Sequence, residues 1–180
     1  IELAAARSRV LPPRALLTRL EHRLDVLASA AADQPLRQRT LRAALDWSYE
    51  LLSERERLLL QRLSVFSGGW TLEAAEAVCA GAGIEQGDVL ELMSHLVDKS
   101  LVEMKLNGES RYRMLETIRQ YAGENLRDAD ASEQVRIRHL EYFLGWAEPT
   151  EQKLKGPEQL DWLKRLDRER DNLRHGLEWS

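Results

Sequence analysis

Residues that could catalyse a reaction or hold a metal ion are scattered along this sequence. The four histidines lie far apart, and none stands at a metal-ligand spacing from another histidine or from the single cysteine, Cys79. The sequence has neither a G-x-x-x-x-G-K-[ST] phosphate loop nor a G-x-S-x-G nucleophile motif. We therefore expect no catalytic residue, no metal site, no cofactor held by this chain and no enzyme activity. The histidines are His22, His95, His139 and His175.

A structural role explains several of the titratable and nucleophilic residues better than a chemical one. His95 lies beside the apolar face of a predicted helix, which favours a boundary or core position over a ligand or pH-switch role. Cys79 stands among alanines and is expected to be a buried small side chain rather than a reactive thiol. Carboxylates such as Glu54 and Glu73 stand at predicted helix starts, where capping explains them better than acid–base catalysis.

The bulk composition indicates a folded globular chain. Of 180 residues, 43% are hydrophobic and 31% are charged, and the formal net charge is −4. This balance gives no overall attraction to DNA or to an anionic membrane, although it allows a local basic patch. No apolar run reaches the roughly 18 residues of a membrane span. With one cysteine and no signal peptide pattern, we expect a cytoplasmic protein. A start without methionine suggests a piece of a longer polypeptide.

The elements that must position any functional residue are mostly helices. Apolar residues recur at three- and four-residue steps through most of the chain. Ser53 and Glu56 form a capping box, and Thr71 and Asp88 are predicted caps of the next two helices. Helices are predicted at 1–10, 14–27, 41–52, 54–66, 72–80, 88–99, 116–129, 132–147 and 157–179.

The hydrophobic period changes between residues 101 and 115. Residues 101–105 and 111–115 are predicted strands, and Asn107-Gly108 between them favours a hairpin turn. Three helices followed by a two-stranded wing are typical of a winged helix, which is a variant of the helix-turn-helix. The predicted fold class is mainly α, with a winged-helix domain that carries a small β-hairpin wing.

The charges of this winged helix argue against DNA binding. The third helix carries Asp88, Glu91 and Asp98 against a single cation, Lys99. Contact with DNA phosphates needs the opposite balance. We therefore expect no DNA contact by this chain and favour a packing and interaction domain. The alternative is a DNA-binding winged-helix module. Its candidate contacts are the wing cations Lys105, Arg111 and Arg113.

Several stretches also carry a family resemblance. In content and order they resemble the bacterial STAND-class ATPase regulators with an NB-ARC-like nucleotide switch, found in LuxR-type and SARP/AfsR-type transcriptional regulators, especially of actinobacteria. The stretches are IELAAAR (1–7), QRTLRAALDWSY (38–49), LSVFSGGWTLEAA (63–75), LVDKSLV (96–102) and RYRMLETIRQYA (111–122).

The resemblance implies a domain layout. Residues 1–52 correspond to the helical domain that follows the nucleotide-binding core, residues 53–127 to the winged helix, and residues 128–180 to the start of TPR-like helices. The implied partners are the upstream nucleotide-binding domain, the downstream repeats and a protein or small-molecule inducer. ADP or ATP with Mg²⁺ is the cofactor that the resemblance implies for the full-length protein.

The resemblance also implies a switch position. The family's M-H-D motif, whose histidine approaches the ADP phosphates, corresponds here to Met114-Leu115-Glu116. Leu115 cannot donate a hydrogen bond to phosphate, whereas Glu116 can still cap the following helix. Leu115 and Glu116 are thus the candidate nucleotide-binding residues. Met114, Leu115 and Glu116 together are the candidate interdomain switch. The function predicted on this basis is an autoinhibitory signal relay that acts through nucleotide-dependent packing.

Overall fold

The computed structural model describes residues 41–107, 109–127, 132–148, 153–157 and 159–178. The helices predicted before residue 40 lie outside these ranges. The first described helix is α4 (Leu41–Glu50), which is held to α8 (Glu116–Arg127) by polar contacts. Arg42 pairs with Glu124 at 3.0 Å, and the Tyr121 hydroxyl donates to Asp46 at 2.7 Å.

Helix α5 (Glu54–Leu63) begins at the predicted capping box. The Ser53 hydroxyl accepts the N–H of Glu56 at 3.3 Å, and the Glu56 carboxylate accepts the N–H of Ser53 at 2.7 Å. The helix ends three residues earlier than predicted. The next N–H groups bond to carbonyls three positions back, so the chain leaves the helix through a tightened turn.

Helices α6 (Leu72–Cys79) and α7 (Val89–Asp98) form a helix-turn-helix pair. Thr71 caps α6 as predicted, because its hydroxyl accepts the N–H of Ala74 at 3.3 Å. Asp88 occupies the N-cap position of α7 as predicted, but its side chain makes no capping hydrogen bond. Its carboxylate pairs instead with Arg55 of α5, and the 3-10 turn Gln86–Asp88 leads into α7.

The wing consists of strands β1 (Glu103–Asn107) and β2 (Glu109–Arg113), which pair antiparallel. Both strands lie two residues closer to the turn than predicted. Residues 101 and 102 are kept out of β1 because their N–H groups bond to the Leu96 carbonyl at 3.0 and 3.3 Å. These bonds close the C-terminus of α7, so β1 starts only after them.

A third short segment extends the wing at Trp70. Its N–H donates to the Tyr112 carbonyl at 2.9 Å, and the Tyr112 N–H donates back at 2.8 Å. Gly69 makes this approach possible, because a Cβ there would lie 2.7 Å from the Tyr112 carbonyl oxygen. The wing therefore joins the helical core through β2.

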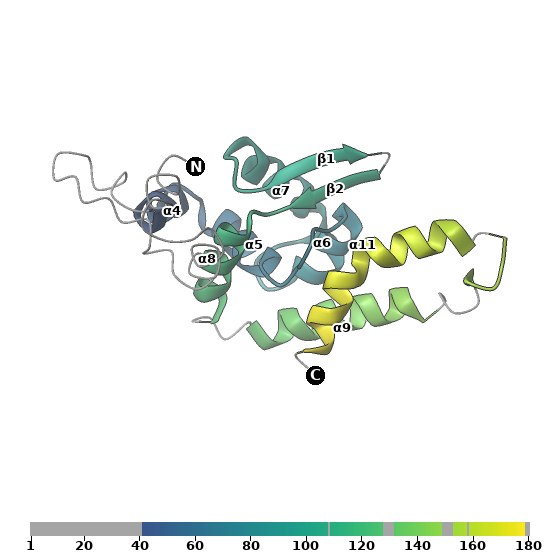
Figure 1. The fold of residues 1–180 in the computed structure, drawn as a ribbon. Helices are drawn as coiled ribbons and strands as arrows, with labels where there is room; N and C mark the ends of the chain where they lie inside the picture. The colour runs from purple at the N-terminus through teal and green to yellow at the C-terminus, as the bar shows by residue number, and fades with distance from the viewer. Residues whose placement is uncertain (1–40, 108, 128–131, 149–152, 158, 179–180) are drawn as a thin grey trace, which may run out of the picture.

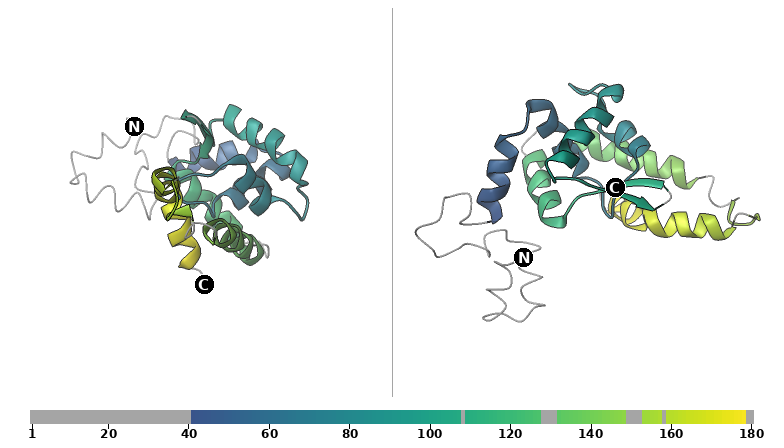
Figure 2. Two further views of the ribbon diagram at one scale, coloured as in Figure 1. Left: turned by 90° about the vertical axis from the view of Figure 1, so that its right-hand side faces the viewer. Right: turned by 90° about the horizontal axis from the view of Figure 1, so that it is seen from above.

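Two further helices lie beneath this unit. Helix α9 (Ser132–Ala147) packs against α6, and α11 (Gln159–Leu177) packs against α9. Figures 1 and 2 show both helices on the opposite side of the molecule from α7. We call α9 and α11 the C-terminal pair.

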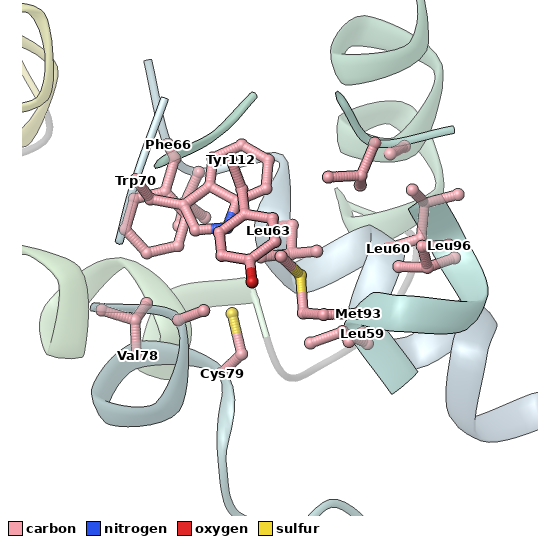
Figure 3. Packing of buried hydrophobic residues seen from close by; sticks show 14 of the residues in the cluster. Leu59, Leu60, Leu63, Phe66, Trp70, Val78, Cys79, Met93, Leu96 and Tyr112 are labelled. Atoms are coloured by element: carbon pink, nitrogen blue, oxygen red, sulfur yellow. The ribbon is translucent and has the colours of Figure 1, made fainter. Parts of the chain in front are cut away.

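The hydrophobic core surrounds α5. Leu59, Leu63 and Phe66 are fully buried, as the predicted apolar face requires. The Phe66 and Trp70 rings stack with centroids 5.3 Å apart, and Figure 3 shows them above Val78 and Cys79 of α6. Met93 and Leu96 of α7 close the other side of this core.

The predicted fold class, mainly α with a winged helix and a small hairpin wing, is confirmed. The domain boundaries at 52 and 127 and the TPR-like character of the last helices stay predictions. No helix in the described part of the chain is long and apolar enough to cross a membrane.

Candidate nucleic-acid interface

Helix α7 turns a mixed polar face outward. Its apolar side is buried in the core through Val89, Met93 and Leu96. The residues exposed on the other side are Leu90, Glu91, Ser94, His95 and Asp98. In Figure 1 this helix lies beside the wing along one edge of the described structure. That placement is the one a helix-turn-helix needs to enter a groove of DNA.

The charges near α7 are partly neutralised within the fold. Asp88 pairs with Arg55, and Lys99 contacts the buried carboxylate of Glu56 at 2.7 Å. Burial by itself raises the pKa of Glu56, but hydrogen bonds from Lys99 and Ser53 outweigh it and lower the pKa. His95 lies at the boundary, half exposed, with Nδ1 3.3 Å from the same carboxylate.

The three wing cations differ in their surroundings. Lys105 and Arg111 stand opposite each other in the hairpin, and Arg113 stands opposite Glu103. Lys105 and Arg113 are exposed, and Arg113 donates to Glu103 at 2.7 Å across the strands. These two residues are therefore the wing cations that DNA can reach.

Arg111 is instead covered by helix α11. Its guanidinium pairs with the buried Glu169, which also accepts a hydrogen bond from Asn172 at 2.8 Å. Asn172 in turn donates to the Gly69 carbonyl at 2.8 Å and accepts the Ser67 N–H at 2.7 Å. A polar network thus ties the C-terminal pair to the wing.

The three switch candidates lie in sequence at the exit from the wing. Met114 packs against the core, whereas Leu115 is 49% exposed. Glu116 starts α8 and pairs with Arg119 at 2.7 Å. Partial burial raises the pKa of Glu116, but hydrogen bonds from Arg119 outweigh it, so the pKa lies below its ordinary value. Whether Leu115 and Glu116 meet a nucleotide stays a prediction.

Sequence reasoning missed the residue that fixes the turn between α6 and α7. Arg62 is buried on the core side of α5 and donates to the carbonyls of Cys79, Gly81 and Ala82. The carbonyl of Cys79 lies 2.6 Å from Nη1 and that of Ala82 2.8 Å from Nη2. A cation among the apolar positions of α5, ahead of a glycine-rich turn, was the available signal.

Two further points concern the thiol of Cys79 and the side chains that could hold a metal ion. Cys79 is fully buried, as predicted, and burial raises the pKa of its thiol to about 12. Within the described ranges, no group of three or more His, Cys, Asp or Glu side chains could hold a metal ion.

Comparison with known families identifies the central unit. Residues 52–127 match the family described as winged helix-turn-helix domain. The chain contains a winged helix-turn-helix domain. This domain comprises α5 to α8 and the wing.

Some relatives of the chain carry the names of transcriptional regulators. “Putative HTH-type transcriptional regulator Rv0890c” of Mycobacterium tuberculosis is 40% identical over 184 residues, covering all of this chain and 20% of that protein. A protein of Mycobacterium bovis, “Putative HTH-type transcriptional regulator Mb0914c”, matches to the same extent. An uncharacterized protein of M. tuberculosis, Rv0894, is 40% identical over 145 residues, which are 79% of this chain and 37% of that protein. The chain spans about a fifth of the length of the first two relatives. No solved structure matches it.

These comparisons overturn one expectation about partners. We expected no DNA contact, because α7 is acidic, but homology to HTH-type transcriptional regulators points to DNA binding. The charge argument counted Asp88 as a free charge, although the fold pairs it with Arg55. It set the wing cations against Glu103 and Glu109, and in the fold Lys105 and Arg113 are both exposed, although Arg113 pairs with Glu103. The matches name neither a nucleotide-binding domain nor TPR-like repeats as partners, and neither regulator name describes an enzyme.

Proposed function

We propose that the winged helix-turn-helix domain binds DNA as part of a transcriptional regulator, with α7 in the major groove and the wing on the phosphate backbone. The observation that carries this proposal is the open face of α7 beside the two exposed wing cations, Lys105 and Arg113. An α-helix with its side chains is roughly 10–12 Å across, which suits a major groove roughly 12 Å wide.

The composition of α7 suits base recognition better than phosphate binding. Carboxylates such as Glu91 can accept a hydrogen bond from the N4 amino group of cytosine. Ser94 can contact several base edges, and Leu90 can pack on a thymine methyl group. Attraction to phosphates then rests on Lys105 and Arg113, so we expect a shallow salt dependence with a log–log slope of roughly −2.

The test is selection of duplexes by the 180-residue chain from a random pool, followed by fluorescence anisotropy across a salt series. A selected duplex should bind at least about 1,000-fold more tightly than a scrambled one. Lys105→Ala and Arg113→Ala should each reduce the salt slope by about 1. Arg42→Ala is the charge-matched control, because Arg42 lies on α4 at the far end of the described structure from the wing. Binding without sequence preference, or equal slopes for all variants, would overturn the proposal.

A second candidate is the signal-relay role that the STAND resemblance implies. The observation in its favour is the docking of α11 on the wing, where Glu169 forms an ion pair with Arg111, one of the candidate DNA contacts. If the docked and released positions of α11 correspond to two regulatory states, Glu169→Gln should loosen α11 and change DNA affinity. Hydrogen exchange of α11 with and without DNA measures the first effect. Equal exchange in both states and in Glu169→Gln would argue against the relay.

A further inference from the structure

A cavity of about 240 Å³ lies between the winged helix and the C-terminal pair. Its walls come from the N-terminus of α6, strand β2, helix α9 and helix α11. No part of the DNA-binding proposal uses this cavity. Its lining includes residues of α11, and Figure 1 shows this helix on the side of the wing away from α7.

One wall of the cavity is aromatic. Tyr142, Phe143 and Trp146 line it from α9. Phe143 is buried, and its ring lies 5.1 Å from that of Tyr142 in an edge-to-face arrangement. Trp146 is half-buried, with its ring centroid 5.8 Å from that of Trp162 in α11. Such a wall favours a flat apolar ligand over a flexible polar one.

Another part of the lining is cationic. Arg165 and Arg168 line the cavity from α11, three positions apart on one helix face, and Arg111 lines it from the wing. The lining also holds two carboxylates, Glu73 and Glu169. Glu169 is already engaged by Arg111 and Asn172. Three guanidinium groups against two carboxylates leave one net positive charge, which suits a monoanion.

The size of the cavity limits the ligand. An apolar cavity of about 150 Å³ accepts benzene, so 240 Å³ accommodates a single six-membered ring with one or two small substituents. Planar guanidinium groups favour carboxylates through paired hydrogen bonds.

We propose that this cavity binds a small monocyclic aromatic carboxylate. Its ring lies against Tyr142 and Trp146, and its carboxylate lies among the guanidinium groups. Because Arg111 belongs both to the cavity and to the wing, binding there also changes the pairing of Arg111 with Glu169. The coupling of the cavity to DNA affinity rests on the proposed DNA-binding function, whereas binding of the carboxylate does not.

The first experiment titrates the 180-residue chain with benzoate and 4-hydroxybenzoate, using saturation-transfer NMR and tryptophan fluorescence. We expect a dissociation constant of about 1 mM or lower. Benzyl alcohol keeps the ring without the charge, and acetate keeps the charge without the ring. Both should bind at least about tenfold more weakly, since each makes only one of the two kinds of contact.

Matched variants locate the binding. Arg168→Gln removes an exposed guanidinium of the lining and should weaken benzoate binding at least about tenfold. Arg170→Gln is the control, because Arg170 is an exposed arginine of the same helix, outside the lining, that pairs with Asp167 at 3.4 Å. Trp146→Leu should also weaken binding. If it fails to fold, Arg165→Gln serves as the second variant.

The outcomes separate the two proposals. Benzoate binding that Arg168→Gln weakens and Arg170→Gln leaves unchanged supports the site, whatever the DNA result. Absence of binding at 20 mM, roughly twenty times the expected constant, or equal binding of benzyl alcohol, would overturn it. With a selected duplex, saturating 4-hydroxybenzoate should shift DNA affinity about fivefold or more. An unshifted DNA affinity would overturn the coupling alone.

Discussion

The winged-helix core and the C-terminal pair are built by different interactions. The core around α5 is mainly apolar, with Leu59, Leu63 and Phe66 fully buried, although Glu56, Arg62 and Ser64 are buried there too. The C-terminal pair also buries polar side chains, which are His139, Glu169 and Asn172, but it buries far fewer apolar ones, which are Val135, Phe143 and Trp162. Its outward apolar residues remain exposed, among them Leu160, Leu163 and Leu177.

The difference concerns how easily each region can be rearranged. Burial of apolar area is non-directional and strong, so the core holds its shape under most conditions. Buried polar contacts depend on geometry and on protonation, and they lose much of their value when one partner changes. We therefore infer that the C-terminal pair can shift on the winged helix while the core stays intact.

The largest expected effect comes from emptying the core at Trp70. Trp70→Ala removes the ring that stacks on Phe66 and should lower the free energy of unfolding by about 3–5 kcal/mol. Trp70→Phe should cost much less, because it keeps a stacked ring and the indole N–H has no hydrogen-bond partner among the described residues. Urea denaturation followed by circular dichroism measures both. Equal losses for the two variants would show that ring packing is not what Trp70 contributes.

Acid should weaken the C-terminal pair before it weakens the core. Burial lowers the pKa of His139 to about 4, against about 6.5 in the unfolded chain. Between these values the unfolded chain binds a proton that the folded chain does not, so stability is full above pH 6.5 and falls as the pH drops towards 4. The loss attributable to His139 is on the order of 3 kcal/mol.

His139→Phe tests this assignment, because it keeps ring contacts with Phe66 and Phe143 and removes the titration. Unfolding of the variant should depend less on pH between 4 and 6.5 than that of the parent chain. His175→Gln is the control for the other depressed histidine, whose pKa burial also lowers. An unchanged pH profile in His139→Phe would assign the acid sensitivity elsewhere.

Asn172→Ala should release α11 without unfolding the core. The change removes contacts with the Ser67 N–H, the Gly69 carbonyl and Glu169, and should cost about 2 kcal/mol. Hydrogen exchange should quicken in α11 and stay slow in α5. Asn125→Ala, which removes one hydrogen bond to the Tyr121 carbonyl within α8, is the control and should have a smaller effect. Faster exchange throughout α5 would mean that the two regions unfold as one.

The smallest expected effect lies at the start of α5. Ser53→Ala removes the hydroxyl that accepts the Glu56 N–H and should cost about 1 kcal/mol. Thermal unfolding measures this loss, and Ser53→Asp should restore most of it, because aspartate is also a favoured cap. A loss as large as that of Trp70→Ala would contradict the view that apolar burial dominates the core.

Local signals in the sequence predicted much of the winged helix. Caps at Ser53 and Thr71 and the helical period placed α5, α6 and α7 within a few residues of their positions. The strands were placed two residues too far from the turn, because the sequence does not show that the Leu96 carbonyl holds the N–H groups of residues 101 and 102. The candidate DNA contacts were named from their charge alone, and only the structure separates exposed Lys105 from covered Arg111.

The sequence by itself determined the fold class, the helix starts and the burial of Cys79. These features depend on interactions that reach only a few residues along the chain, or on the apolar character of one helix face. Tertiary structure decided the rest: the bridge from Trp70 to Tyr112 of β2, the Arg62 contacts with the turn, the Asp88 pair with Arg55, and the packing of α11 over the wing. Each of these joins residues distant in sequence, and such pairs are set by how the helices pack.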